Sequence, residues 1–313
     1  MSRVLVTGGA GFIGGHLVER LVATGREVRV LDDLSTGYRR NLLAVENDVE
    51  FIEGTICDPQ TLARCCAGVD VVFHLAAQGS VPRSVEEPRT AHEINATGTL
   101  NVLIAARDAG VRRVVYSASS AAYGDTPTLP KVETIPPQPL SPYAVSKLTG
   151  EYYCACFSAV YGLSTISLRY FNVFGPRQDP NSQYAAAIPA FVTRLVRGQP
   201  PIVYGDGEQS RDFCFIENVV HANLLAAEVE HAAGEVVNIA CGEHITLNRI
   251  IALMREHLGV DIEPQYAAPR PGDVRHSLAD ISAARRLLGY EPQVMFAEGL
   301  SRSIDWYREN YAQ

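Results

Sequence analysis

Hydrophobic and polar positions follow a regular rhythm along the first half of the chain. Short apolar runs alternate with longer stretches in which apolar residues recur at helical spacing, and this predicts β-strands that alternate with α-helices. That order is typical of a parallel sheet covered by helices on both faces. The predicted elements are Arg3–Thr7, Phe12–Thr24, Glu27–Leu31, Val49–Glu53, Val69–Leu75, Glu93–Ala109, Val114–Ser117, Tyr143–Tyr161 and Ser164–Arg169.

The rhythm degrades after about residue 170. Stretches punctuated by proline and glycine separate short helical patterns at Ala187–Arg197, Leu247–Leu258 and Phe296–Tyr307. We therefore predict an α/β fold in which residues 1–170, with a return at about 213–240, form a Rossmann-like doubly wound parallel sheet. Residues 171–212 and 241–313 are predicted to form a smaller C-terminal α/β domain that binds the substrate.

Composition narrows the class of protein. Of the 313 residues, 47% are hydrophobic and 20% are charged, as in an ordinary soluble globular protein. The formal net charge of −8 provides no long-range positive field to gather nucleic acid or anionic lipid. We therefore expect neither nucleic acid nor a membrane as a partner, and an anionic substrate must be held by a few placed cations.

Targeting and metal signals are not found in the sequence. Met1 to Arg3 leads directly into the first predicted strand, and the longest run without a charged residue, Tyr152–Leu168, is shorter and more polar than a membrane span of about 20 apolar residues. The seven cysteines form no Cys-x-x-Cys pair, and the histidines show no zinc-ligand spacing. We expect a cytoplasmic protein with reduced thiols and no metal.

A glycine-rich turn follows the first predicted strand. Gly8, Gly11 and Gly14 stand between that strand and an amphipathic helix. Glycines at this spacing suit a tight turn, a close approach of the backbone to a pyrophosphate, and close packing of helix against strand, while the helix N-terminus favours negative charge. The sequence therefore predicts a dinucleotide site at the start of the chain.

The second predicted strand ends in an acid. Asp32 lies where a carboxylate can accept hydrogen bonds from the hydroxyls of an adenine ribose and repel a 2′-phosphate, so NAD is favoured over NADP. Arg39 and Arg40 follow shortly after and are the residues that weigh against this preference.

Two further segments form a candidate catalytic constellation. The strand Val114–Ser117 opens into a run of small hydroxyl residues that includes Ser119, at the end of the strand where open α/β sheets bind ligands. Ser141 and Pro142 predict a helix start, which places Tyr143 and Lys147 one turn apart on one face. An adjacent ammonium and a positive nicotinamide ring both favour phenolate, so Tyr143 can exchange a proton with a sugar hydroxyl that Ser119 also binds.

These pieces, in this order, resemble the extended short-chain dehydrogenase/reductase family, and within it the nucleotide-sugar 4-epimerases. The resemblance runs over nearly the whole chain and is carried by residues 7–14, 31–37, 74–84, 143–147 and 168–175.

The resemblance implies a set of roles. Asn172, Arg211 and Arg270 would meet the substrate diphosphate, Asp273 the uridine ribose and Tyr204 the uracil, while Asn95 would support the active site. The implied NAD-binding residues are Gly8, Gly11, Phe12, Ile13, Gly14, Asp32, Asp33, Ser35, Thr36, Gly37, Ile56, Leu75, Ala76, Ala77, Asn95, Ser117, Tyr143, Lys147 and Tyr170. The implied substrate-binding residues are Ser119, Ser120, Tyr143, Asn172, Ala187, Ile188, Tyr204, Arg211, Arg270, Asp273 and Ser277.

The resemblance also implies an isomerase reaction and an assembly. Tyr143 removes the O4 proton, hydride leaves C4 for tightly held NAD, the 4-keto sugar turns, and hydride returns to its other face. Ser277 stands where a tyrosine would crowd a 2-acetamido group, so we expect UDP-GlcNAc and UDP-GalNAc to be accepted as well as UDP-Glc and UDP-Gal. A homodimer through the helices at 93–109 and 143–161 is expected.

Some positions depart from the family pattern, and three other functions stay open. Thr55 replaces the usual aspartate beside adenine. A 4,6-dehydratase would carry Asp-Glu where this chain has Ser120 and Ala121, and a glucuronate 4-epimerase would need a cation where it has Asp179. A non-catalytic NAD-binding regulator would not need Ser119, Tyr143 and Lys147 together.

Overall fold

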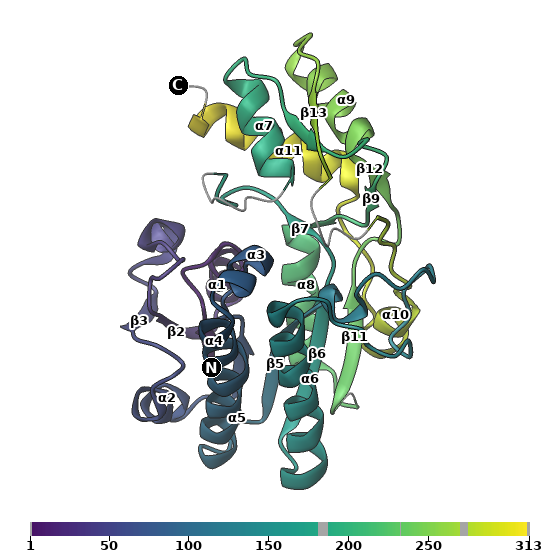
Figure 1. The fold of residues 1–313 in the computed structure, drawn as a ribbon. Coiled ribbons are helices and arrows are strands. Elements are labelled where there is room, and N and C mark those ends of the chain that lie inside the picture. Colours follow the sequence, from purple (N-terminus) through teal and green to yellow (C-terminus); the bar gives the residue numbers. More distant parts are fainter. Residues whose placement is uncertain (1, 181–186, 232, 270–274, 312–313) are drawn as a thin grey trace.

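The computed structural model describes residues 2–180, 187–231, 233–269 and 275–311 (Figure 1). Its centre is a seven-stranded sheet in the order β11-β6-β5-β4-β1-β2-β3, and every neighbouring pair in it is parallel. The strand order reverses between β1 and β4, which is the arrangement of a doubly wound fold. The strands are β1 Arg3–Thr7, β2 Glu27–Asp32, β3 Val49–Glu53, β4 Val71–His74, β5 Arg113–Ser119, β6 Ser164–Tyr170 and β11 Glu235–Ile239.

Helices cover both faces of the sheet. Successive residues of a strand point to opposite faces, so they belong to two different apolar clusters. In β1, Val4 and Val6 belong to one apolar cluster while Leu5 belongs to the other. The first cluster includes α1 (Phe12–Ala23), η1 (Arg39–Val45) and α8 (Ile216–Glu228). The second includes α2 (Pro59–Cys66), α5 (Gly98–Asp108) and α6 (Pro142–Tyr161).

The chain between β4 and α5 departs from the simple predicted helix at 93–109. Two short helices, α3 (Val81–Glu86) and α4 (Pro88–His92), run into a π-helical turn, η2 (Glu93–Thr97), before α5 begins at Gly98. Such turns occur often at functional sites, because the wider turn re-aims a side chain. This turn contains Asn95.

The second part of the molecule lies above the carboxyl ends of the strands (Figure 1). Three helices, α7 (Ala187–Val196), α9 (Leu247–Leu258) and α11 (Phe296–Tyr311), pack against one another there. Its strands form three small pairs: β7 (Val173–Phe174) with β10 (Cys214–Phe215), β9 (Ser210–Arg211) with β12 (Ile245–Thr246), and β8 (Ile202–Tyr204) with β13 (Gln265–Ala267).

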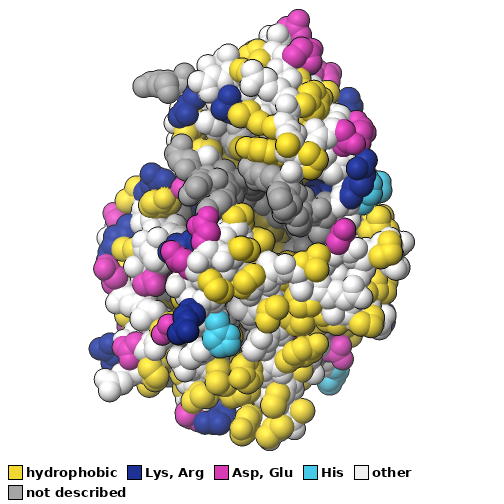
Figure 2. Space-filling model, in the orientation of Figure 1, with side chains coloured by type: hydrophobic (Ala, Val, Ile, Leu, Met, Phe, Trp, Pro, Cys, Tyr) yellow, Lys and Arg dark blue, Asp and Glu magenta, His cyan; other side chains and the backbone are white. Residues whose placement is uncertain are grey.

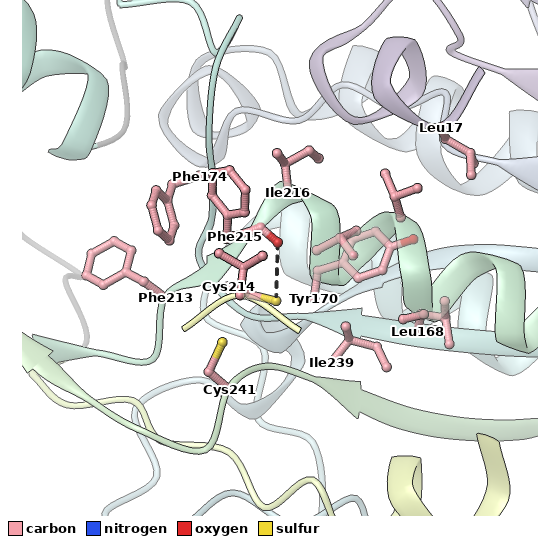
Figure 3. Packing of buried hydrophobic residues seen from close by; sticks show 14 of the residues in the cluster. Leu17, Leu168, Tyr170, Phe174, Phe213, Cys214, Phe215, Ile216, Ile239 and Cys241 are labelled. Carbon is pink, nitrogen blue, oxygen red and sulfur yellow. Dashed lines mark hydrogen bonds between the residues drawn. The ribbon is translucent and has the colours of Figure 1, made fainter. Parts of the chain in front are cut away.

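A cluster of aromatic rings joins the two parts. Phe174 lies with its ring centroid 6.0 Å from that of Phe213, 5.5 Å from Phe215 and 5.4 Å from Phe296. Figure 3 shows Phe174, Phe213 and Phe215 near the Cys214 and Cys241 thiols, at one end of a core that continues past Tyr170 and Leu168. One apolar cluster therefore runs from the sheet into the upper part and fixes the two sides of the cleft between them.

The predicted Rossmann-like doubly wound fold is confirmed. The strands at 3–7 and 49–53 and the helix at 247–258 begin and end where the pattern predicts. Helix α8 was not predicted, since Asn218 and Asn223 interrupt its apolar face and are buried through hydrogen bonds to the Val294 and Val219 carbonyls.

The domain boundaries stay a prediction: β11 joins the large sheet, but α10 (Ser282–Leu288) packs on β11 and α8 rather than with α7. No helix in the described ranges is long and apolar enough to cross a bilayer.

Candidate active site

A cavity of about 1100 Å³ lies between the carboxyl ends of the strands and the upper part of the molecule. It spans the point where the strand order reverses, which is where open α/β sheets bind their ligands. Most of the predicted site residues line it: Gly8, Gly11, Phe12, Ile13, Gly14, Asp32, Asp33, Ser35, Thr36, Gly37, Ile56, Leu75, Ala76, Ala77, Ser117, Ser119, Ser120, Tyr143, Lys147, Tyr170, Asn172, Ala187, Ile188, Tyr204, Arg211 and Ser277.

The glycine turn after β1 leaves space that only glycine can leave. Gly8 has a positive φ of 71°, and a Cβ on it would lie 2.6 Å from the backbone nitrogen of Ala76. A Cβ on Gly14 would collide with the Gly8 carbonyl oxygen and lie 2.7 Å from Gly9 Cα. Gly11, the N-cap of α1, offers no side-chain oxygen to the first N–H groups of the helix, which suits them to an anion.

Asp32 is held rigidly at the end of β2. Its carboxylate accepts hydrogen bonds from the backbone N–H of Ala10 and of Leu34, each at 2.9 Å. Burial raises the pKa of Asp32, and these two hydrogen bonds oppose the rise. The glycine cradle and this carboxylate together fit the pyrophosphate and ribose of NAD.

The two arginines that weigh against NAD are engaged with other partners. Arg39 pairs with Glu53 at 3.2 Å and stacks 4.2 Å over the Phe51 ring, and Arg40 stacks 4.2 Å over the Tyr38 ring. The Asp32 carboxylate, together with the engagement of the Arg39 and Arg40 guanidiniums by other side chains, favours a cofactor without a 2′-phosphate.

The predicted start of α6 brings the catalytic candidates together. Ser141 caps the helix, its hydroxyl accepting from the Ala144 N–H at 3.1 Å, and Pro142 occupies the first turn. Burial raises the pKa of Tyr143, and a hydrogen bond with Ser119 opposes that rise. Burial lowers the pKa of Lys147 to about 8, with Glu151 opposing the change. The Lys147 ammonium lies 4.8 Å from the centroid of the Tyr116 ring.

Asn95 lies in the layer behind the cavity wall rather than on it. Its side chain accepts from the Gln78 N–H at 2.8 Å and donates to the Gln78 carbonyl at 3.1 Å and to Ser146 Oγ at 3.0 Å. Ser146 in turn donates to the carbonyl of Tyr143 at 2.8 Å. Asn95 thus ties the β4 loop to the first turn of α6.

Asn172, Arg211 and Ser277, which the resemblance assigns to the substrate, line the same cavity. Asn172, with a positive φ of 23°, donates to the Asp212 carbonyl at 2.9 Å and to Ser277 Oγ at 3.2 Å. Arg211 donates to the carbonyl oxygens of Ser210 and Arg275, at 2.9 and 3.0 Å. Arg270 and Asp273 lie outside the described residues.

Many residues of the cavity wall were not predicted, and three of them carry side chains of interest. Gln78 is 4% exposed and its side-chain amide has no hydrogen-bond partner among the described residues. Lys131 is 2% exposed and its ammonium contacts Thr126. Phe213 lies beside Arg211. Gln78 stands within the segment 74–84 that carried the resemblance, whereas Lys131 and Phe213 come from loops whose path a sequence pattern does not set.

Comparisons with known proteins agree with this geometry. Residues 4–240 match the NAD dependent epimerase/dehydratase family. The UDP-glucose 4-epimerase of Mycolicibacterium smegmatis is 39% identical, with 98% of each chain covered. The solved UDP-N-acetylglucosamine 4-epimerase of Methanobrevibacter ruminantium M1, in complex with UDP-N-acetylmuramic acid, is 40% identical with a TM-score of 0.95 over 99% of each chain. The UDP-glucose 4-epimerase of Thermotoga maritima with UDP-glucose is 41% identical, with a TM-score of 0.94 over 98% of this chain and 99% of that one.

The chain therefore belongs to the NAD dependent epimerase/dehydratase family. Its resemblance to the nucleotide-sugar 4-epimerases is confirmed, and it is an NAD-dependent isomerase.

The close packing around Gly14 predicts how a substitution there affects NAD binding. Wild-type protein purified from cells will carry NAD(H), and Gly14→Ala will weaken that hold by roughly 10- to 100-fold, the effect of forcing one carbon against rigid backbone. Bound nucleotide is measured after denaturation, and the affinity of the emptied protein by titration. Gly79→Ala is the matched control, because Gly79 also lines the cavity but a Cβ there meets nothing within 4 Å. Equal NAD binding by the two variants would contradict the assignment.

Proposed function

We propose that the chain is a UDP-hexose 4-epimerase that interconverts UDP-GlcNAc with UDP-GalNAc, and also UDP-Glc with UDP-Gal, through a transient 4-keto sugar. The main support for the proposal is that a single cavity is lined by Tyr143, Ser119 and Lys147 and also by Arg211 and Tyr204. We infer that Arg211 holds the nucleotide diphosphate while the hexose lies against Tyr143.

The protein's part in the reaction is to move one proton and to hold the charge that this creates. Tyr143 accepts the proton of the sugar O4 while Ser119 hydrogen-bonds the same oxygen. The Lys147 ammonium stabilises the phenolate form of Tyr143. NAD, when bound, supplies the hydride acceptor and donor for C4. Because the nucleotide diphosphate is held by groups other than the base, the 4-keto sugar can turn without leaving the site.

The cation that the diphosphate requires comes from the upper part of the molecule. In a chain of net charge −8, Arg211 brings a guanidinium to the cavity wall, and Arg270 is expected to join it. Guanidinium groups suit this role, since they bind phosphate oxygens in a bidentate manner.

The alternatives lack the residues they need. Ser120 and Ala121 form the η3 turn (Ser120–Tyr123) beside the base and supply no acid for the loss of water that a dehydratase carries out. Asp179 accepts a hydrogen bond from the Tyr38 hydroxyl at 3.0 Å and supplies no cation for a uronate. A non-catalytic regulator would not require a buried ammonium beside Tyr143.

Tyr143→Phe tests the assignment of the base. Phenylalanine preserves the packing but removes the proton acceptor, so we expect turnover of UDP-GlcNAc and UDP-Glc to fall by about 10²- to 10⁴-fold while the bound NAD is retained. Tyr153→Phe, on the same helix, is the control. Turnover within tenfold of wild type would rule out Tyr143 as the base, and stoichiometric consumption of added NAD by wild type would make the chain a dehydrogenase.

Acceptance of the 2-acetamido group is assigned to Ser277. The Ser277 hydroxyl accepts a hydrogen bond from the Asn172 side chain at 3.2 Å, and a larger side chain at this position would occupy part of the cavity, whose packed walls yield little to added volume. Ser277→Tyr should lower the rate on UDP-GlcNAc much more than the rate on UDP-Glc, whereas Ser277→Ala, which removes only the hydrogen bond, should keep the wild-type ratio. If the tyrosine variant also keeps that ratio, Ser277 does not control the acetamido preference.

A homodimer is proposed through α5 and α6. Large apolar side chains are exposed on these neighbouring helices, among them Tyr152 at 60% and Val160 at 66%. Figure 2 shows hydrophobic side chains gathered on this part of the surface, and an exposed apolar patch of this kind marks an interaction site. Tyr152→Glu should convert a dimer to a monomer by light scattering, while Tyr266→Glu, at an exposed tyrosine on β13, should not. A monomeric wild type would contradict this proposal.

A further inference from the structure

A buried ion pair lies behind the catalytic lysine and outside the cavity wall. Glu151, one helical turn beyond Lys147 on α6, accepts hydrogen bonds from Arg169 of β6, at 3.0 Å from Nε and 2.7 Å from Nη2. The two side chains are 2% and 4% exposed. This pair makes no contact with the cavity, so the proposed reaction does not by itself account for it.

Fold stability is a weak explanation for the pair. Replacing a buried ion pair by apolar residues is often neutral or stabilising, because desolvation costs about as much as the attraction returns. Within the described ranges, Arg169 Nη1 is also buried without a hydrogen-bond partner. The guanidinium is fixed 4.7 Å over the Tyr123 ring, and Tyr123 is fixed by its hydrogen bond to Asn238 at 2.7 Å.

The groups around Lys147 are almost all neutral. His74 of β4, held between Thr7 and Thr99, has its pKa lowered by burial to about 3, and burial raises the pKa of Cys154 of α6 to about 12. Tyr116 of β5, whose ring faces the ammonium, has its pKa raised well above the usual range by burial. Besides these and Tyr143, the charges near Lys147 in the described part of the chain are the carboxylate of Glu151 and, behind it, the guanidinium of Arg169.

We propose that Glu151 and Arg169 are positioning residues for the catalytic pair: Glu151 supplies the negative charge that lets Lys147 stay an ammonium in a dry site, and Arg169 limits that charge by sharing it. The proposal rests on Tyr143 being the base. With Lys147, Glu151 and Arg169 all ionised, the cluster carries a net charge of one positive unit, and formation of the Tyr143 phenolate neutralises it. The pair therefore favours the charge state in which the base works.

The two partners should act on Lys147 in opposite directions. Without the carboxylate, the ammonium loses its attraction and faces an unshared guanidinium, so its pKa falls. Without the Arg169 guanidinium, the Glu151 carboxylate attracts the Lys147 ammonium alone, so the pKa of Lys147 rises. A merely structural ion pair predicts that breaking it from either side perturbs the site in the same direction.

The chain itself makes this measurable, because Lys131 and Lys147 are its only lysines. Protein with bound NAD, labelled with ¹³C at lysine Cε, gives two lysine NMR signals, and Lys131→Arg assigns them. Glu151→Gln should lower the pKa of Lys147 by roughly one unit and Arg169→Gln should raise it, in line with the effect of one nearby charge. Arg169→Lys, which keeps the charge, alters the geometry and adds a third lysine signal that is identified by its absence from the wild-type spectrum, should leave the pKa of Lys147 near its wild-type value.

The pH dependence of kcat should shift in the same direction as the pKa of Lys147 in each variant. The alkaline limb of the pH profile of kcat should move to lower pH in Glu151→Gln and to higher pH in Arg169→Gln. If one single variant does not fold, the double variant, which leaves no unpaired charge, should restore the Lys147 pKa toward wild type. Shifts in one direction for both single variants, or an NMR shift without movement of the kcat profile, would overturn the proposal. A wild type without epimerase activity would contradict the proposed function instead, since the NMR titration does not depend on turnover.

Discussion

The site depends on one turn of helix that keeps a phenol and an ammonium on the same face of α6. Four features fix the position of that turn. Ser141 and Pro142 set where the helix begins, and Ser84 Oγ accepts the N–H of Tyr143 at 3.0 Å. Further along, the Tyr116 hydroxyl donates to the Lys147 carbonyl at 3.1 Å, and Gly150 has no Cβ, which would otherwise lie 2.5 Å from the Tyr116 ring. These contacts fix the position of Tyr143, the proposed base.

The burial that fixes the position of Tyr143 also makes its charged form energetically unfavourable. Burial opposes both the Tyr143 phenolate and the Lys147 ammonium, as the directions of their pKa shifts indicate. Each charge becomes tolerable when the other is present, and a positive nicotinamide ring adds to the support for phenolate. In the proposed mechanism the net charge of this cluster therefore contributes to catalysis, although Glu151 and Arg169 do not line the cavity.

The sequence pattern predicted those parts of the site whose residues lie close together along the chain. The turn from Gly8 to Gly14, the acid at Asp32 and the pair of Tyr143 and Lys147 each lie within one strand, turn or helix, so spacing along the chain places them. Asn95 could be singled out only by resemblance, and its position behind the wall follows from a π-helical turn that has no sequence signature. The Glu151 to Arg169 contact joins a helix to a strand through tertiary packing, and no periodicity reveals it.

In the proposed mechanism, a hydrogen leaves C4 of the hexose as hydride and returns to the same carbon without exchanging with water. UDP-GlcNAc that carries deuterium at C4 can be converted by the purified protein in ordinary water, and the product analysed by mass spectrometry and NMR. We expect UDP-GalNAc with the deuterium retained at C4. Replacement of the deuterium by solvent hydrogen would indicate proton removal from carbon, and would contradict the proposed mechanism.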